Sequence, residues 1–388
     1  MPVRVVVAMS GGVDSSVAAA VLKEQGYDII GITLQIWDVP DSIRSCCGFQ
    51  AIKDAQRVCA KLDIPFYTID TREIFKEKVI LDFCSEYPKG RTPNPCIRCN
   101  QFIKFDFLLN KAKELKADKI ATGHYATVEY DKNKRRWLLK KGVDERKDQS
   151  YVLYTMTQEQ LSKTLFPLGR LKKPEVRNIA SKLYLPVAEK PESQEICFIP
   201  DNNYPRFLKE IANQEPIPGR ILDVYGKVIG KHPGIIYYTV GQRKRIGIAS
   251  QEPLYVIRID AEHNNIIVGL ETDVYSKKFV ATDLNLISVP ELKQPITALT
   301  KIRYTHQPAS ANIYPVRKKF LNSRSNVISN DNIGLTKISN GVNPIDNRVE
   351  VEFNEGQWAI TPGQAVVFYD NDTVIGGGII ETNYKSDS

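Results

Sequence analysis

The sequence predicts an α/β protein with an N-terminal parallel-sheet domain, a small central mainly-β domain and a C-terminal antiparallel β-barrel. In the first half, apolar strand-like runs alternate with helical segments of about ten or more residues, which is typical of βαβ units. Past residue 210 the helical pattern gives way to short β-branched runs separated by turn signals. A length of 388 residues also favours two or three domains.

The first half divides into four strands and four helices. The predicted strands are Val3–Met9, Asp28–Gln35, Phe66–Ile69 and Lys119–Thr122. The predicted helices are Ser15–Glu24, Ala51–Leu62, Ile74–Phe83 and Phe102–Leu115. Ligands of parallel sheets bind beyond the carboxyl ends of the strands. We therefore expect the loops after Met9, Gln35 and Thr122 to converge on one crevice.

The second half begins after a Pro/Gly connector, Glu215–Gly219. Its predicted strands are Ile235–Val240, Pro253–Ile259 and Ile266–Gly269 in the central domain, and Ala298–Tyr304, Arg348–Phe353 and Ala365–Tyr369 in the barrel. Lys318–Pro344 is rich in Asn and Ser, which favours a surface insertion that is exposed or disordered. The predicted domains are 1–212, 213–276 and 277–388.

Composition narrows the class of protein. Lys and Arg number 53 against 45 Asp and Glu, and this net charge of +8 suits a polyanionic partner. No apolar run approaches the ~18–20 residues of a membrane span, which argues against an integral membrane protein. The N-terminus has no signal or transit pattern, and the seven cysteines are an odd number, which does not favour a disulfide scaffold. A reducing compartment, the cytoplasm, is expected.

The first strand is followed by the loop Ser10–Ser16, SGGVDSS, which opens the first helix. Two glycines permit a tight turn, and the serine hydroxyls with the helix N-terminus favour a phosphate site. The loop lacks both the lysine of a Walker A motif and the G-x-G-x-x-G spacing. A capped βα turn is the alternative interpretation. Asp14 is a candidate magnesium ligand or, equally, a helix N-cap.

Two cysteine segments are candidates for chemistry. Cys96 and Cys99 lie in the loop GRTPNPCIRCN, where Arg91, Arg98 and Lys104 are expected to lower a thiol pKa. Cys197 follows 98 residues after Cys99 (197 − 99), so the two thiols can meet only through the fold.

Other interpretations of the thiols stay open. Cys96 and Cys99 could form half of a zinc site or a redox pair, although the chain has only four histidines and no second C-x-x-C. Buried, inert thiols are expected for Cys59 and Cys84, and structural thiols for the vicinal Cys46-Cys47.

Taken together, several motifs carry a family resemblance. SGGVDSS resembles the signature of PP-loop ATP pyrophosphatases, which have an adenine nucleotide alpha hydrolase-like fold. With GRTPNPCIRCN, ATGHYA, KDQSYVLY, SQEICFIP, GQRKRIGI and TPGQAVVFYD, in this order, the chain resembles the tRNA-specific 2-thiouridylases, or tRNA-uridine 2-sulfurtransferases. The resemblance covers nearly the whole chain except about 318–344.

The resemblance implies roles for individual residues. The implied ATP contacts are Ala8, Met9, Ser10, Gly11, Gly12, Val13, Asp14, Ser15, Leu34 and Gly123. The implied catalytic residues are Cys99 and Cys197, and no protein-bound metal site is implied. The implied tRNA contacts are Asn94, Pro95, Cys96, His124, Lys147, Asp148, Gln149, Arg303, Tyr304 and Gln364. From the residues alone, His124 reads equally as a core histidine and Lys147–Gln149 as a solvated turn.

The resemblance also implies a reaction. ATP, with Mg²⁺, adenylates the C2 oxygen of the wobble uridine in the anticodon stem-loop of tRNAs for lysine, glutamate and glutamine. A persulfide on Cys197, received from a sulfur-relay or cysteine desulfurase protein, supplies the sulfur. Cys99 assists, and a Cys99–Cys197 disulfide remains to be reduced. A monomer is expected.

The chain departs from the family pattern at Cys96, where some members have an aspartate assigned to acid/base work. Cys96 could also pair with Cys99 in an off-pathway disulfide. Two other functions stay open: a PP-loop ligase or amidotransferase that uses ammonia, and a non-catalytic RNA-binding protein. Gln242–Arg245 is a basic cluster that suits the phosphate backbone or simply a solvated face.

Overall fold

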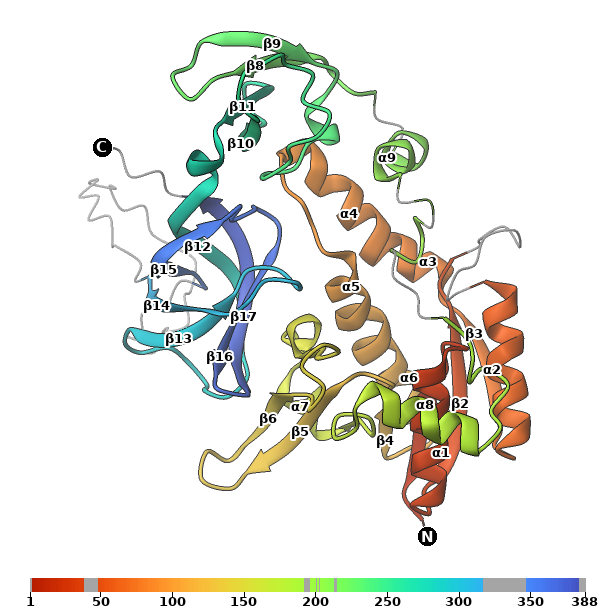
Figure 1. Ribbon diagram of the computed structural model, residues 1–388. Coiled ribbons are helices and arrows are strands. Elements are labelled where there is room, and N and C mark those ends of the chain that lie inside the picture. The colour runs from red at the N-terminus through yellow and green to blue at the C-terminus, as the bar shows by residue number, and fades with distance from the viewer. Residues whose placement is uncertain are drawn as a thin grey trace, which may run out of the picture.

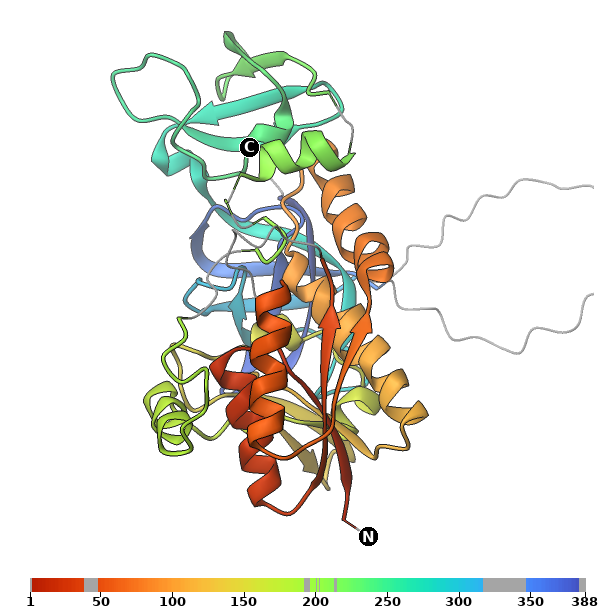
Figure 2. The same cartoon turned by 90° about the vertical axis from the view of Figure 1, so that its right-hand side faces the viewer.

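A computed structural model describes residues 2–37, 48–191, 196–199, 201, 203–212, 215–316 and 347–383. Figure 1 shows three regions: a parallel-sheet region at the N-terminus, a small β region formed by the middle of the chain, and a C-terminal barrel. In the view of Figure 2 the middle region lies at the end of the molecule opposite the N-terminus. The predicted fold class is confirmed.

The N-terminal sheet is parallel and has the order β3-β2-β1-β4-β7. Its strands are β1 (Arg4–Ala8), β2 (Asp28–Gln35), β3 (Phe66–Asp70), β4 (Lys119–Ala121) and β7 (Thr164–Leu165). The four predicted strands are therefore present, and β2 has the predicted bounds. β7 was not predicted, because two residues carry no periodic signal.

Helices cover both faces of this sheet. The helices that precede the middle region are α1 (Val13–Glu24), α2 (Phe49–Lys61), α3 (Arg72–Phe75), η1 (Lys76–Ile80), α4 (Leu81–Glu86), η2 (Tyr87–Lys89), α5 (Pro95–Arg98), η3 (Cys99–Phe107), α6 (Leu108–Glu114), η4 (Ser150–Leu153), α7 (Gln158–Ser162), α8 (Lys173–Lys182) and α9 (Tyr204–Ala212). Alternate residues of β1 face opposite sides: Val5 and Val7 pack with α1, α2 and α8, whereas Val6 packs with η3 and α6. The helical run carrying Cys99 thus lies directly against the central strand.

The middle region is a four-stranded sheet of order β10-β11-β8-β9. Its strands are β8 (Gly219–Leu222), β9 (Val228–His232), β10 (Tyr255–Asp260) and β11 (Asn265–Gly269). The prediction of a strand at Ile235–Val240 is wrong, because Ile235–Tyr237 forms a 3₁₀ turn, η5. Ile235 and Ile236 are buried in this turn, so packing overrides their β propensity.

Six antiparallel strands close the C-terminal barrel, because β12 pairs with both β15 and β17. After the turn η6 (Glu271–Val274), these strands are β12 (Tyr275–Leu286), β13 (Ile296–Lys301), β14 (Ala309–Pro315), β15 (Val349–Trp358), β16 (Ala365–Asp370) and β17 (Thr373–Asn383). The predicted strand Ala298–Tyr304 ends earlier, so Arg303 and Tyr304 lie in the turn after β13.

A hairpin of the N-terminal region extends the barrel sheet. It consists of β5 (Ala126–Asp131) and β6 (Arg136–Lys141), and Lys140 of β6 pairs with Thr373 of β17. One hydrophobic cluster accordingly contains both Val6 of the parallel sheet and Val367 of the barrel. The two regions share a core.

Within the described residues no helix has the length and apolar character needed to cross a membrane. The predicted surface insertion and the vicinal Cys46-Cys47 lie outside the described residues.

Candidate active site

The predicted phosphate loop lies where the direction of the sheet connections reverses. β1 stands between β2 and β4, and crevices at such a point bind ligands in α/β sheets. Gly123, which follows β4, approaches the loop so closely that a Cβ there would lie 2.7 Å from the Ser15 nitrogen. The loops after β1 and β4 therefore converge, as the sequence predicts.

The loop backbone is fixed by glycine and by its own hydroxyls. Gly11 has a φ of +68°, and a Cβ there would overlap the carbonyl oxygen of Ala51. The Ser15 and Ser16 hydroxyls donate to the Gly12 carbonyl at 3.2 and 2.8 Å, and the Ser10 amide donates to Ser15 Oγ at 3.1 Å. These two buried serines shape the loop, whereas Ser10 is exposed at its mouth.

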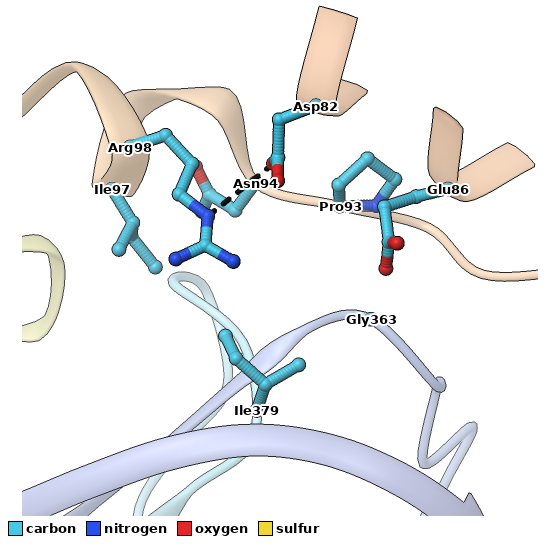
Figure 3. A pocket seen from close by; sticks show the side chains of 8 residues that line it. All are labelled: Asp82, Glu86, Pro93, Asn94, Ile97, Arg98, Gly363 and Ile379. Carbon is cyan, nitrogen blue, oxygen red and sulfur yellow. Dashed lines mark hydrogen bonds and ion pairs between the residues drawn. The ribbon is translucent and has the colours of Figure 1, made fainter. Parts of the chain in front are cut away.

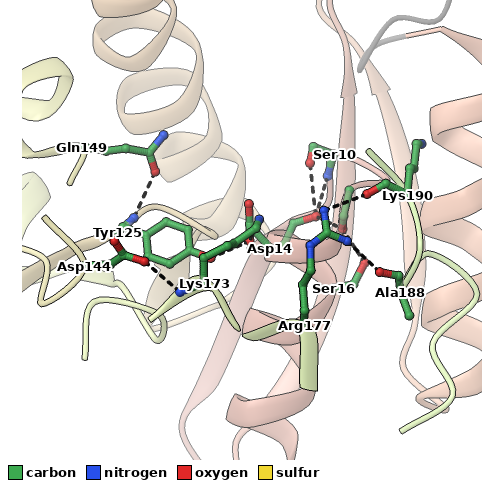
Figure 4. Close-up of polar contacts among 12 residues, drawn as sticks. Ser10, Asp14, Ser16, Tyr125, Asp144, Gln149, Lys173, Arg177, Ala188 and Lys190 are labelled. Carbon is green, nitrogen blue, oxygen red and sulfur yellow. Dashed lines mark hydrogen bonds and ion pairs between the residues drawn. The ribbon is translucent and has the colours of Figure 1, made fainter. Parts of the chain in front are cut away.

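Helix α1 opens the loop to an anion. Its N-cap residue is Gly12, so no capping side chain occupies the first backbone N–H groups. The N-cap role considered for Asp14 is therefore wrong. Instead, Asp14 Oδ1 accepts hydrogen bonds from the Tyr125 hydroxyl and from Lys173 Nζ, both at 2.7 Å (Figure 4).

A second lysine reaches the loop from the segment after α8. Lys190 Nζ donates to the Gly11 carbonyl at 2.8 Å and forms an ion pair of 2.7 Å with Asp54 of α2. Arg177 of α8 holds this segment by donating to the carbonyls of Ala188 and Lys190 (Figure 4).

Sequence reasoning missed both lysines. Lys173 lies 159 positions after its partner Asp14, and Lys190 lies 179 positions after Gly11, so no local motif links them to the loop. Only the packing of α8 against α1 places two cations beside a loop that lacks a lysine of its own.

The candidate thiols contact one hydrophobic cluster. Cys99, at the start of η3, is 9% exposed and belongs to it, and the half-buried Cys197 packs against it. Leu34 at the end of β2 packs against the same cluster and against the core of the parallel sheet. Two thiols 98 positions apart (197 − 99) thus contact the same cluster, and Leu34 links that cluster to the core of the parallel sheet.

The loop between η2 and α5 presents the third cysteine. Asn94 caps α5 by accepting from the Cys96 amide at 3.1 Å, Pro95 is buried and Cys96 is exposed. The two arginines expected to act on these thiols have carboxylate partners: Arg91 pairs with Glu86 at 2.6 Å and Arg98 with Asp82 at 3.3 Å.

Two other cysteines have the environment of structural thiols. Burial raises the pKa of Cys59 to about 12 and that of Cys84 to about 11. Since the thiolate is the nucleophile, both remain protonated and unreactive near neutral pH.

Comparison with known proteins settles the family. A family described as tRNA methyl transferase HUP domain matches residues 3–201. The matches continue with its PRC-barrel domain at 205–270 and an aminomethyltransferase β-barrel domain at 336–380. The tRNA-specific 2-thiouridylase MnmA of Acetivibrio thermocellus is 50% identical over 97% of this chain and 99% of its own length. The chain belongs to the tRNA-specific 2-thiouridylase family.

Two further family members match at the same level. A tRNA-specific 2-thiouridylase of Caldanaerobacter subterraneus subsp. tengcongensis is 50% identical over 98% of this chain and 99% of its own length. That of Geotalea uraniireducens is 50% identical over 97% of this chain and 95% of its own length.

Several residues that the family resemblance assigns to tRNA are engaged inside the protein. His124 is 7% exposed, its Nδ1 lies 2.7 Å from the Thr122 hydroxyl, and burial, with the nearby Lys104 charge, holds its pKa well below the usual value. Asp148 accepts from the Gly142 and Ser150 amides. The tRNA roles of these residues stay predictions.

The remaining assigned contacts of the 2-thiouridylase family differ in exposure. Gln149 accepts from the Tyr125 amide at 3.0 Å, and the half-buried Lys147 lies two positions before it. Tyr304 is 39% exposed, and the Arg303 guanidinium lies 5.1 Å from the Trp358 ring centroid. Gln364 donates to the Thr92 carbonyl at 2.7 Å. Only Tyr304 and Cys96 among these assigned tRNA contacts are exposed side chains.

The described residues contain no group of three or more His, Cys, Asp or Glu side chains that could hold a metal ion. The described residues therefore offer no further ligands that could complete a zinc site with Cys96 and Cys99.

Proposed function

We propose that the protein is an ATP-dependent tRNA-uridine 2-sulfurtransferase that converts the wobble uridine of tRNA to 2-thiouridine. One observation carries the proposal: Cys99 and Cys197 contact a single cluster, and Leu34 joins that cluster to the sheet whose switch point holds the phosphate loop. The printed names of relatives that match over nearly the full chain support the same reaction.

ATP is the proposed co-substrate. The uncapped start of α1 supplies backbone N–H donors, and Lys173 and Lys190 supply positive charge beside them. In this proposal both lysines exchange their carboxylate partners, Asp14 and Asp54, for phosphate oxygens. Mg²⁺ accompanies the phosphates, and Asp14, released from Lys173, is the carboxylate of the loop that suits it.

The proposed chemistry has two stages. The C2 oxygen of uridine first takes the adenylyl group of ATP, and pyrophosphate leaves, which converts a poor electrophile into one with AMP as leaving group. The terminal sulfur of a persulfide on Cys197 then bonds to C2 as AMP departs. Cys99 attacks the inner sulfur, so the S–S bond of the persulfide is exchanged for a Cys99–Cys197 disulfide.

Each turnover leaves Cys99 and Cys197 as a disulfide, which is oxidised by two electrons relative to the two thiols. A thiol reductant must therefore restore both cysteines before the next turnover, and a cysteine desulfurase or sulfur-relay protein must reload Cys197. The catalytic cycle therefore requires two partners, a thiol reductant and a sulfur donor.

The test is nucleoside mass spectrometry of unmodified tRNA incubated with the protein, Mg²⁺, a cysteine desulfurase and its cysteine substrate, with and without ATP. We expect 2-thiouridine only with ATP, together with one pyrophosphate and one AMP for each sulfur incorporated. Release of AMP and pyrophosphate with no sulfur in the tRNA, but with ammonia incorporated into an acceptor, would instead indicate the alternative PP-loop ligase or amidotransferase. Absence of both products would reject the proposal.

A further inference from the structure

Thr92 lies just before the segment that carries Asn94, the N-cap of α5, and Pro95 and Cys96 in its first turn. Thr92 is bonded to both other regions of the molecule. Its amide donates to the Pro362 carbonyl at 2.8 Å, and its carbonyl accepts from Gln364 Nε2 at 2.7 Å. Its hydroxyl donates to the Thr239 hydroxyl of the middle region at 3.3 Å. The amide, the carbonyl and the hydroxyl of Thr92 therefore all form hydrogen bonds between regions of the molecule.

The barrel side of this contact is rigidly built. Gly363 has a φ of +89°, and a Cβ there would lie 2.8 Å from the Thr92 nitrogen. Gly363 and Gln364 are themselves bonded to Ile380 of β17, with the Gly363 amide donating to Ile380 and the Ile380 amide donating to Gln364, both at 2.8 Å. The segment touching Thr92 is thus part of the closed barrel and leaves no room for a side chain at position 363.

A small cavity remains between the barrel and the segment that contains Asn94. Figure 3 shows Gly363 and Ile379 of the barrel facing Pro93, Asn94 and Arg98 across a small cavity. Its volume is about 20 Å³, which is room for about one water molecule.

We propose that Thr92, Gly363 and Gln364 form a junction through which the barrel and the middle region position the segment 92–96. Gln364 then acts as a positioning residue through the Thr92 carbonyl, which differs from the direct tRNA contact that the family resemblance implies. The effect of this junction on activity rests on the proposed function, in which Cys96 and its neighbours lie where the target base reacts.

The direct test is amide hydrogen exchange of peptides spanning Gly90–Cys99. Gln364→Leu removes the donor to Thr92, and Gly363→Ala forces the two backbones apart. Each should speed exchange in this segment about five- to tenfold, since a hydrogen bond contributes about 1 kcal/mol net. Thr92→Val, which removes only the hydroxyl contact to Thr239, should give about a two- to fivefold increase.

Thr297→Val is the matched control, because its hydroxyl donates to Asn312 on the neighbouring barrel strand, at 2.8 Å, and not to any residue of the junction. It should leave exchange of Gly90–Cys99 unchanged. Thermal melting of each variant identifies any that fail to fold, and Thr92→Val, the mildest change, then decides.

Activity provides a second readout. In Gln364→Leu the junction predicts a lower kcat for thiolation with little change in the Kd for tRNA. Exchange at the wild-type rate in all three junction variants, with weaker tRNA binding by Gln364→Leu alone, would overturn the junction in favour of a direct tRNA contact. Faster exchange in the junction variants, together with a wild-type protein that makes no 2-thiouridine, would leave the junction standing and reject the proposed function.

Discussion

At the scale of single residues, two lysines change the interpretation of the nucleotide loop. SGGVDSS lacks the lysine of a Walker A loop, yet Lys173 and Lys190 stand beside it through tertiary contacts. Lys173 is 8% exposed and bonds a carboxylate oxygen that also accepts from Tyr125. Because Lys173 pairs with a carboxylate in the first turn of α1, we expect its buried cation to bind a phosphate group of ATP.

Lys173→Met should weaken ATP binding about tenfold or more, because a hydrogen bond to a charged group contributes about 1.5–3 kcal/mol. Isothermal titration with ATP measures the affinity, and thermal melting checks that the variant is folded. The neighbouring Lys172 is exposed, so Lys172→Met is the matched control and should bind ATP like the wild type. A folded Lys173→Met protein with unchanged ATP affinity would limit this lysine to a structural role.

At the scale of elements, the loop between β1 and α1 depends on one glycine for two separate reasons. Gly11 has both a positive φ and no room for a Cβ, whereas Gly26, after α1, has a φ of +84° but nothing within 4 Å of a Cβ. Comparing the two positions separates backbone strain from steric overlap.

Gly26→Ala should therefore lower the free energy of unfolding by about 1 kcal/mol, through strain alone. Gly11→Ala should lower it by at least about 2 kcal/mol more, because the backbone of Ala51 in α2 must also move. Urea unfolding monitored by circular dichroism measures both. An equal decrease in the free energy of unfolding in the two variants would show that the backbone of α2 moves away from position 11 without destabilising the protein.

Predictability from sequence also differs between elements. The strands β1 to β4 have continuous apolar runs bounded by turns, so they were predicted within about two residues. Ile235 and Ile236 have the same β-branched character but are buried in a 3₁₀ turn, since their neighbours in space decide the conformation. In the site, the loop and the cysteines have sequence motifs. Lys190 lies in no motif, and the motifs that contain Thr92 and Gln364 do not predict the hydrogen bond between them, because the partners are more than 100 positions apart.

At the scale of the whole molecule, the three regions are joined through shared cores. Barrel residues such as Val367 and Tyr369 belong to the cluster of the parallel sheet, and Ile221 and Val256 of the middle region belong to the cluster of Cys99. A loss of packing in any region therefore reaches the candidate active site. We expect cooperative unfolding rather than three separate transitions.

Buried histidines predict how this stability depends on pH. Burial lowers the pKa of His124, His232 and His306 in the folded protein. The unfolded chain therefore binds more protons below its histidine pKa of about 6.5, so the free energy of unfolding falls as the pH falls. His232 shows the reason: Nε2 bonds the Asn264 carbonyl, so a proton on the buried Nδ1, which has no partner among the described residues, would lack an acceptor.

Urea unfolding between pH 7.5 and pH 5 should accordingly show a loss approaching about 1.4 kcal/mol per pH unit for each histidine that titrates only on unfolding. His232→Gln should reduce the slope. A free energy of unfolding that is constant between pH 7.5 and pH 5 would contradict the claim that these histidines stay neutral in the folded protein.

The central claim concerns the sulfur on Cys197, and one measurement tests it most directly. Cys197→Ala and Cys84→Ala are purified side by side, since both thiols contact the same hydrophobic cluster but only Cys197 is assigned to chemistry. Each is incubated with ATP, Mg²⁺, unmodified tRNA and a cysteine desulfurase with its cysteine substrate, and 2-thiouridine is quantified by mass spectrometry. The account predicts loss of 2-thiouridine in Cys197→Ala and its retention in a folded Cys84→Ala protein. Full 2-thiouridine formation by Cys197→Ala would contradict it.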